Sequence, residues 1–464
     1  MDLRRRTAGG LALLGAAAAL AVPPATSAAP PVKLERIAGV QAPGTPERLN
    51  RVGILRVGPR SAPNILVLNP GTSASAAYFA PLAKTIVRQA DGWQVWAVER
   101  RENLLEDQSV FDEGKAGTKT AEQVFDYYLG YLEDPSVTEH FEAIPNEQVA
   151  YAKRWGMATE IGDLRKVVQR ATRQAEHVVV GGHSLGGTIT TAYATWDFGG
   201  TAGAEGLSGL VLIDGASRTE AVTADEAQAS LDRLNDPGAS PWLTFGGIPA
   251  PFTGLFNTSG ALGVLTSPDT PSLGQQFGLL PADLKPPVTA SNIGQYGYAL
   301  DVDTSPPGLV AAQAHLGRLA DSGDPRGWVS DEITPIRRFA QMFAGWKLPG
   351  LDGTAWYHPT RLTLDAGAVA NGNANPAQEL LGVKATHGRD LPRDLRILAF
   401  GASLGGPRVG EAAYALAEQS GIPRRNVTAI TRAKTYSHND PNSAYPKNAF
   451  LARLVPFLER IGRG

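Results

Sequence analysis

Cysteine is absent from the 464 residues of this sequence. Its absence excludes disulfide bonds, a thiol nucleophile, thiolate ligands for a metal and a lipid-modified N-terminal cysteine. Stability must therefore come from a packed core. Apolar residues make up 43% of the chain, which is long enough for one large catalytic domain with an insertion or for two ordinary domains.

An excess of charge of either sign is also lacking. The formal net charge is -2 and no long run of like charges occurs, so nothing indicates nucleic acid or an anionic membrane surface as a partner. The sequence contains no His-Glu-x-x-His motif and no carboxylates clustered at metal-ligand spacing. Its glycines fit neither a dinucleotide-binding nor a phosphate-binding loop. We expect neither a metal nor a cofactor.

A hydrophobic run long enough to span a bilayer is missing as well. The apolar run at residues 11–22 is about twelve residues long, against roughly twenty for a membrane-spanning helix. Arginines at 4–6 precede this run, prolines at 23 and 24 end it, and small residues at 27–29 offer a cleavage site. This layout predicts a secretory signal peptide over residues 1–29, a secreted mature protein and no membrane segment after cleavage.

Short β-rich runs alternate with helical patterns along the rest of the chain. The expected strands are 52–57, 65–68, 94–98, 177–180, 210–213, 395–400 and 427–430, and the expected helices are 76–88, 160–174, 187–196, 410–419 and 449–461. Several strands are continuous apolar runs, which is typical of strands buried on both faces of a parallel sheet. The pattern predicts an α/β domain with a doubly wound, mostly parallel sheet.

Two connections are too long to be simple crossovers between strands. Residues 100–158 contain an acidic and aromatic stretch, and residues 216–390 are rich in glycine, proline and apolar residues. Loops of this length usually have a function or a structure of their own. We expect a core formed by residues 30–215 and 391–464, with 216–390 as a cap over the site and 100–158 as a candidate part of that cap.

The clearest chemical motif is Gly182-His183-Ser184-Leu185-Gly186, a G-x-S-x-G sequence placed between an expected strand and an expected helix. A tight strand-to-helix turn exposes the serine hydroxyl above the sheet, and the flanking glycines allow a close approach of neighbouring elements. The helix N-terminus adds a favourable dipole, and the Leu185 amide can donate to an oxyanion. We therefore predict Ser184 as a nucleophile.

With this motif in its strand–turn–helix setting, the sequence resembles the α/β-hydrolase superfamily, and the resemblance covers most of residues 50–462 in element order. The resemblance implies a serine, an acid and a histidine in that chain order, together with an oxyanion loop after an early strand. It also implies that a cap can follow the sixth strand.

A second G-x-S-x-G sequence occurs at Gly401-Ala402-Ser403-Leu404-Gly405. If Ser403 were the nucleophile, only about sixty residues would remain for the acid, the base and the rest of the sheet. Ser184 has several strands before it and ample chain after it. We therefore interpret the second sequence as a glycine-rich turn.

The base is predicted at His438, which follows the last expected strand and precedes the last expected helix, where the superfamily places its histidine. Position is the criterion, because the sequence has seven histidines. Of the others, His140 and His315 lie on helical patterns, His177 begins a strand and His183 is inside the elbow. His358 and His387 lie in the 216–390 insertion.

The acid departs from the commoner pattern of the superfamily, which places it in the loop after strand seven. That loop has no carboxylate here, whereas Asp214 follows the sixth expected strand directly. A minority of the superfamily uses this position, and Asp214 there would orient His438 and stabilise the imidazolium. Glu411 and Asp440 are the alternatives. Asp214 as a residue that only caps a turn also remains open.

The expected oxyanion loop is Asn69-Pro70-Gly71-Thr72-Ser73, directly after the strand at 65–68. The resemblance implies that the Thr72 amide is the second donor beside that of Leu185. An ordinary turn is the other interpretation, since proline and glycine favour turns with or without such a site.

These residues predict a serine hydrolase that cleaves a small-molecule or lipid carboxylic ester through an acyl-enzyme. A secreted exopeptidase of the same fold is an alternative, for which the acidic residues Asp225, Glu226 and Asp232 would have to bind a peptide amine. A binding protein without activity would usually lack the serine or the histidine, and an epoxide or haloalkane hydrolase would need a carboxylate in place of Ser184. The oligomeric state is left open by the sequence.

Overall fold

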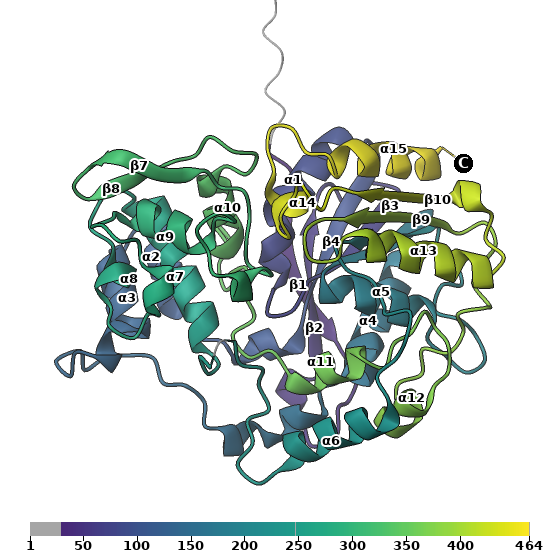
Figure 1. Cartoon of the computed structure of the whole chain (residues 1–464). Coiled ribbons are helices and arrows are strands. Elements are labelled where there is room, and N and C mark those ends of the chain that lie inside the picture. The colour runs from purple at the N-terminus through teal and green to yellow at the C-terminus, as the bar shows by residue number, and fades with distance from the viewer. Residues whose placement is uncertain (1–28, 246, 464) are drawn as a thin grey trace, which may run out of the picture.

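The structure of the protein is a computed structural model that describes residues 29–245 and 247–463. Its centre is an eight-stranded sheet with the order β1-β2-β4-β3-β5-β6-β9-β10. The strands are β1 (Val32–Ala38), β2 (Arg51–Val57), β3 (Asn64–Asn69), β4 (Trp93–Glu99), β5 (His177–His183), β6 (Gly209–Ile213), β9 (Arg396–Gly401) and β10 (Val427–Thr431). Strand β2 is antiparallel to both neighbours, and every other neighbouring pair is parallel. The predicted doubly wound, mostly parallel sheet is confirmed (Figure 1).

Helices of the core lie between these strands and cover both faces of the sheet (Figure 1). They are α1 (Ala80–Gln89), α4 (Met157–Thr172), α5 (Leu185–Ala194), α13 (Pro407–Gln419), α14 (Asp440–Ser443) and α15 (Leu451–Gly462). Short 3-10 helices are η1 (Glu47–Leu49), η2 (Ala76–Phe79), η3 (Arg101–Leu105), η4 (Gly130–Leu132), η5 (Asn146–Arg154), η6 (Ala282–Leu284), η7 (Pro307–Leu309) and η8 (Arg424–Asn426).

Strand β3 illustrates why the strands read as continuous apolar runs. Leu66 and Leu68 belong to the core cluster that includes α1 and α15, whereas Ile65 and Val67 belong to the cluster that includes α4, α5 and α13. Successive side chains of a strand point to opposite faces, so a sheet covered on both faces needs apolar residues at every position.

Each of the seven predicted strands corresponds to a strand of the large sheet. Strand β1 was not expected, because it pairs with β2 alone at the edge and Lys33, Glu35 and Arg36 interrupt its apolar pattern. The helix expected at 76–88 divides into η2 and α1, since Pro81 lies in the first turn of α1, where its missing N–H costs no hydrogen bond.

The two long connections have structure of their own. The first contains α2 (Ser109–Ala116) and α3 (Ala121–Tyr128). The second contains α6 (Ala224–Asn235), α7 (Phe252–Thr266), α8 (Leu273–Gln276), α9 (Asn292–Leu300), the β7 (Arg318–Gly323)–β8 (Arg326–Val329) hairpin, α10 (Ile336–Phe343), α11 (Thr360–Ala366) and α12 (Pro376–Leu381).

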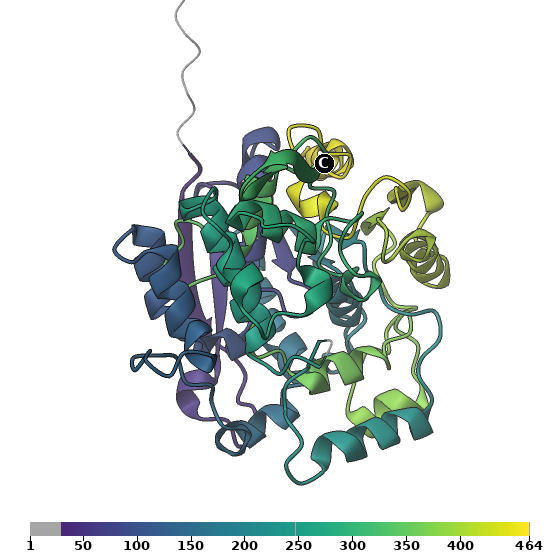
Figure 2. The same cartoon turned by 60° about the vertical axis from the view of Figure 1, so that its left-hand side comes forward.

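An aromatic cluster joins the two connections. Phe111 and Tyr128 stack with ring centroids 4.1 Å apart, and both pack edge-on against Trp356. Helices α2 and α3 also pack on α7. Figure 2 shows these helices in front of the strands when the view of Figure 1 is turned. Helices α2, α3 and α7 therefore form one packed unit, whereas α6 packs on α11 and α12, and α11 also packs on α4 and α5 of the core.

The predicted signal peptide falls almost wholly on residues 1–28, which lie outside the described residues. Over residues 29–245 and 247–463, no helix combines the length and the apolar character needed to cross a bilayer.

Candidate active site

Ser184 lies at the sharp turn between β5 and α5. Its backbone angles, φ 58° and ψ −126°, fall in a region that residues with side chains seldom occupy. The Ser184 amide donates to the carbonyl oxygen of Ile213 at 2.9 Å, which fixes the turn against the end of β6. A Cβ on Gly186 would overlap with the Asn69 carbonyl oxygen, so glycine allows the close approach of β3. The turn thus has the strained geometry of a nucleophile elbow.

His438 and Asp214 come together beside this turn. His438 Nδ1 lies 2.7 Å from Asp214 Oδ2, and both side chains are buried. An ionised carboxylate only accepts hydrogen bonds, so Nδ1 carries the proton and Nε2 is left free to act as a base. Ser184 Oγ makes no hydrogen bond to His438 among the described residues. Such bonds are often long in enzymes without substrate.

The carboxylate of Asp214 lies in a nest of backbone amides. Oδ1 accepts from the amides of Ala402 at 2.6 Å and Gly405 at 2.9 Å, and Oδ2 accepts from Leu404 at 3.2 Å. Burial would raise the pKa of Asp214, but the hydrogen bond and charge of His438, with the Ala402 amide, outweigh burial and lower this pKa. Asp214 is therefore ionised and held in one orientation.

The second G-x-S-x-G sequence supplies that nest. Ser403 itself is exposed, so its hydroxyl lies apart from the buried pair. A Cβ on Gly405 would lie 2.8 Å from Asp214 Oδ1, so the loop can wrap the carboxylate only with glycine at this position. This loop contains no carboxylate of its own. Its backbone amides instead bind the carboxylate of Asp214, which follows the neighbouring strand β6.

The two alternative acids lie elsewhere. Glu411 is exposed on α13. Asp440 is fully buried at the start of α14, where it accepts from the amides of Ser437 at 2.6 Å and His315 at 3.0 Å. It is thus a loop residue that holds the chain around His438. The helical pattern around His315 was misleading, since His315 lies in a loop and pairs with Asp440.

His183, inside the elbow, makes contacts that the sequence did not reveal. Its Nε2 lies 2.8 Å from the His438 carbonyl oxygen and its Nδ1 lies 2.9 Å from the hydroxyl of Tyr78. Burial, followed by the charge of His438, lowers the pKa of His183 to about 3, so the ring is neutral. Because a carbonyl only accepts, Nε2 carries the proton and holds the backbone of His438 in place. The one sequence feature that could have indicated these contacts was a polar residue, His183, at the variable position before Ser184 in the G-x-S-x-G motif.

The predicted oxyanion loop lies directly against the nucleophile. A Cβ on Gly71 would lie 2.9 Å from Ser184 Cβ. Thr72 and Leu185 are half-buried on either side of this contact. Leu185 is the first residue of α5, so its amide has no acceptor within the helix. The structure thus brings both predicted donor residues to the surroundings of Ser184.

Arg100, which directly follows β4, is the main residue of this site that the sequence did not predict. Its side chain is fully buried and donates to the carbonyl oxygens of Pro70, Gly71 and Ala74 at 2.8–3.0 Å. His358 Nδ1 accepts from the Ser73 amide at 3.3 Å on another side of the loop. The position of Arg100 at the carboxyl end of a buried strand was an available signal, since such ends meet at one edge of a parallel sheet.

The acidic residues that would mark an exopeptidase lie on α6. Asp225, Glu226 and Asp232 are all exposed. Glu226 forms a capping box with Thr223, and Asp232 accepts from Gln228. Glu226 is thus part of the helix cap, and Asp225 and Asp232 lie on the exposed face of the helix.

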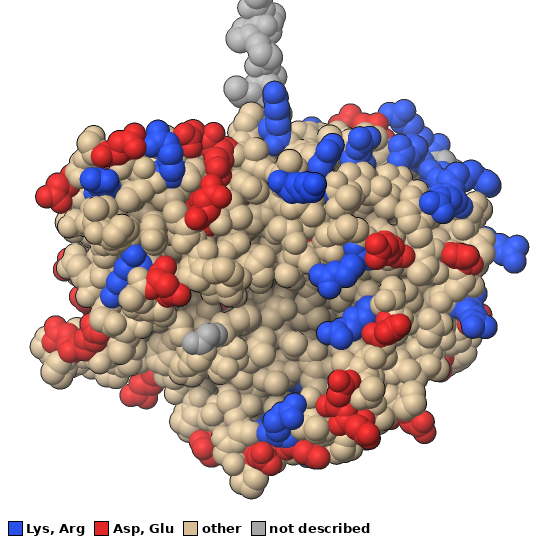
Figure 3. All heavy atoms as spheres, in the orientation of Figure 1, with Lys and Arg blue, Asp and Glu red and all other residues tan. Residues whose placement is uncertain are grey.

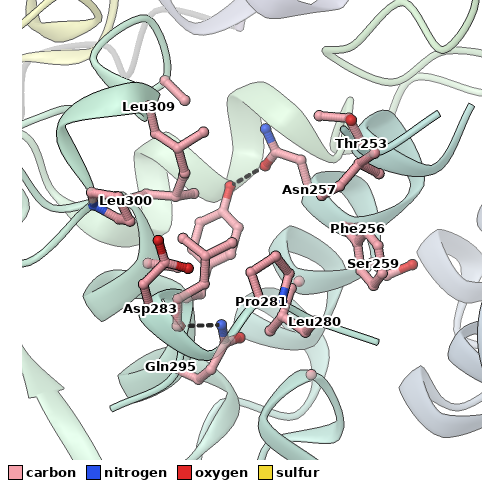
Figure 4. Close-up of a pocket in the computed structure, with 18 of the residues that line it drawn as sticks. Thr253, Phe256, Asn257, Ser259, Leu280, Pro281, Asp283, Gln295, Leu300 and Leu309 are labelled. Carbon is pink, nitrogen blue, oxygen red and sulfur yellow. Dashed lines mark hydrogen bonds between the residues drawn. The ribbon is translucent and has the colours of Figure 1, made fainter. Parts of the chain in front are cut away.

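The face of the molecule seen in Figure 1 is hollowed near its centre, and almost no charged side chain is visible in the hollow (Figure 3). A cavity of about 330 Å³ lies between α7 and α9. Its lining is mostly apolar and includes Phe256, Leu280, Leu300 and Leu309 (Figure 4).

No protein-family model matches the sequence, and no curated protein matches it. Solved structures that align with it include a protein from Sulfolobus solfataricus assigned as a lipase, with 14% identity over 93% of this chain and 92% of the other and a TM-score of 0.45. A soluble variant of monoglyceride lipase from Saccharomyces cerevisiae aligns with 11% identity over 94% and 97%, with a TM-score of 0.40. A haloalkane dehalogenase from Bradyrhizobium elkani aligns with 11% identity over 93% and 99%, with a TM-score of 0.40. The strand order and register of the chain itself define its fold.

Proposed function

From the α/β-hydrolase fold of this chain, we propose that it is a serine hydrolase that cleaves carboxylic esters through an acyl-enzyme intermediate. The observation that carries the proposal is the hydrogen bond between His438 Nδ1 and the ionised Asp214, because a proton held on Nδ1 makes Nε2 the basic nitrogen of the ring. This arrangement favours a serine hydrolase over a binding protein, because a fold kept only for binding has no need of a buried carboxylate that orients an imidazole.

In the proposed reaction, Ser184 Oγ attacks the ester carbonyl carbon while His438 Nε2 takes the hydroxyl proton. The tetrahedral oxyanion receives hydrogen bonds from the amides of Thr72 and Leu185. His438 then gives its proton to the departing alcohol. A water molecule attacks the acyl-enzyme by the same route, and the acid and free Ser184 are released.

Asp214 remains ionised throughout this cycle. Its carboxylate keeps the Nδ1–H tautomer of His438 and stabilises the imidazolium that forms in each half-reaction. The three amides around Asp214 support this role, because their hydrogen bonds favour the charged form of the carboxylate.

We further propose that the protein is exported and that residues 216–390 serve as a cap. Export rests on the N-terminal pattern of arginines, apolar residues and small residues. The cap proposal rests on the hydrogen bonds of this insertion to the oxyanion loop, such as those of Ala355 N to Ser73 O and Ser75 N to Gly353 O.

A fluorophosphonate probe tests the nucleophile. We expect labelling of the wild-type protein and loss of both labelling and ester hydrolysis in Ser184→Ala. Ser403→Ala is the matched control, since it removes the serine of the second G-x-S-x-G sequence, and it should keep both. Labelling that persists in Ser184→Ala and disappears in Ser403→Ala would overturn the proposal.

A further inference from the structure

We infer that the cavity between α7 and α9 binds the uncharged apolar chain of the ester while the ester group lies at Ser184. This inference rests on the proposed function. The cavity volume of about 330 Å³ is that of a small ligand site, and its walls come almost entirely from residues 245–312 of the insertion.

The cavity lies beside the loop that carries the histidine. Its wall includes Pro306, Gly308, Leu309 and Ala312, and the neighbouring residues 311 and 313 are hydrogen-bonded to the residue after His438. Asn439 Nδ2 donates to the carbonyl oxygens of Ala311 at 3.0 Å and Gln313 at 3.2 Å, and the Asn439 amide donates to the same oxygen of Gln313 at 3.2 Å. One segment of chain thus borders both the cavity and the base.

Helix α7 links the cavity to the oxyanion loop in the same way. Thr253 and Asn257 of this helix line the cavity. Gly254, between them, packs so closely on Thr354 that a Cβ there would lie 3.0 Å from Thr354 Oγ1, and Thr354 forms a β-bridge with Ala74, the residue after the oxyanion loop. The two groups that must converge on the ester therefore adjoin walls of one cavity.

The lining explains what kind of group the cavity accepts. Asp283 is its single charged residue among those described. Two of the polar side chains are already paired, because Asn257 Oδ1 accepts from Tyr296 at 2.8 Å and Gln295 Nε2 donates to Leu284 O at 3.3 Å (Figure 4). Phenylalanine, leucine and alanine carbons make up much of the rest. Such a lining favours a hydrocarbon chain and disfavours a charged one.

Gly308 offers a direct test. It lines the cavity, a Cβ there meets no atom within 4 Å, and its backbone does not require glycine. Gly308 is also exposed, so Gly308→Leu should place a side chain at the rim of the cavity and narrow it without strain. Gly327→Leu is the matched control, since Gly327 in β8 has the same open surroundings and ordinary backbone but lies outside the cavity.

The measurement is kcat/KM for p-nitrophenyl esters with acyl chains from acetate to laurate, and for acetate esters of alcohols of the same lengths. In the wild type, each added methylene should raise kcat/KM by about fourfold until the cavity is full. Gly308→Leu should move the optimum to shorter chains, whereas Gly327→Leu should leave the whole profile unchanged. The series that shifts identifies whether the acyl or the alcohol chain is bound.

The outcomes separate this inference from the proposed function. If no ester is hydrolysed and the fluorophosphonate does not label Ser184, the proposed function fails. If esters are hydrolysed but both chain-length series are the same in Gly308→Leu as in the wild type, the function stands and the cavity is not the binding site.

A second observation carries a separate inference, that Arg100 is a positioning residue of the oxyanion hole. Its guanidinium binds the Pro70, Gly71 and Ala74 carbonyl oxygens from one side, while Glu102 binds its Nε at 2.8 Å. In a trans peptide the N–H points away from the C=O of the same unit. The hydrogen bond of Gly71 O to Arg100 therefore turns the Thr72 amide to the opposite side of the loop.

Arg100→Lys and Arg100→Gln test this role. Both should lower kcat, with the glutamine variant falling by about a hundredfold to a thousandfold, while KM stays within about threefold. The affinity for a trifluoromethyl ketone, which forms an oxyanion on Ser184, should fall in parallel with kcat. Lysine keeps the buried charge beside Glu102 and should retain more activity than glutamine.

Arg101→Gln is the control for a merely structural effect. Arg101 is equally buried and pairs with Asp163 at 2.7 Å, but its hydrogen bonds go to the chain around Val40 and Asn50. The Arg101→Gln variant should have a lower unfolding temperature than the wild type and a normal kcat. Normal kcat in folded Arg100→Gln, an equal loss of kcat in Arg101→Gln, or failure of both Arg100 variants to fold would each reject the inference.

Discussion

His438 Nδ1 and Asp214 Oδ2 lie 2.7 Å apart although 224 positions separate the two residues in the chain. The contact is possible because β6, β9 and β10 are successive parallel strands, so the segments that follow β6 and β10 leave the sheet at the same edge, with the turn after β9 between them. The strand order therefore decides which carboxylate reaches the histidine.

Asp214→Asn should lower kcat by about three to four orders of magnitude, because the amide no longer holds the Nδ1–H tautomer or stabilises the imidazolium. The measurement is kcat per folded molecule, with thermal unfolding recorded for each variant. Glu411→Gln is the control, since Glu411 is exposed on α13 and should have no effect. Normal kcat in Asp214→Asn would show that Asp214 only caps a turn.

Gly405→Ala should disturb the same carboxylate through the backbone. The new methyl group would lie 2.8 Å from Asp214 Oδ1 and closer still to a methyl of Val409, so the loop must shift. We expect a loss of about 1–3 kcal/mol in the free energy of unfolding and a fall in kcat of about a hundredfold. Gly327→Ala, with open space around its Cβ, should change neither quantity. Equal effects of the two substitutions would refute this account of the nest.

The His315–Asp440 pair predicts a pH-dependent stability. The hydrogen bond that His315 donates to the Asp440 carboxylate raises the pKa of His315, and this effect outweighs burial, which lowers it. The protonated ring is thus favoured in the folded state, so its stabilisation is complete below the unfolded pKa of about 6.5 and is lost as pH rises through the folded pKa.

His315→Gln should therefore lower the unfolding temperature more at pH 5.5 than at pH 9. The control is His140→Gln, at a histidine whose ring stacks on Tyr131 at 4.1 Å. A deficit in His315→Gln that is constant with pH, or that grows toward pH 9, would contradict the assignment.

Expression of the whole chain in a bacterium with a secretory pathway tests the N-terminal segment. The exported protein should begin near Ala29 or Pro30, and N-terminal sequencing decides this. An intact Met1 terminus in the membrane fraction would exclude a cleaved signal peptide at residues 1–29.

The large sheet could be predicted well because its strands are buried on both faces, and each buried run leaves a continuous apolar signal such as that of residues 65–68. Edge strand β1 and the β7–β8 hairpin leave no such signal, since they are only partly buried. The structure thus follows the pattern most closely where burial is complete.

The site was predictable as far as a motif or a position in the element order defines it. Ser184 has a motif, and His438 has its place before the last helix. Arg100 and His183 act through backbone carbonyl oxygens, and any chain segment can present a carbonyl oxygen, so no sequence pattern marks their partners. Contacts of this kind become visible only when the loops are placed in space.

The late position of β9 and β10 has a consequence for how the chain is made. Synthesis produces six strands of the sheet and the whole of residues 216–390 before β9 emerges, so the β6 edge stays without its partner while that insertion is made. An unpaired edge is a template for association with other chains, and closing so long a loop slows folding. A nascent chain of this topology therefore exposes an unpaired central strand during that interval, when association with its copies is a hazard.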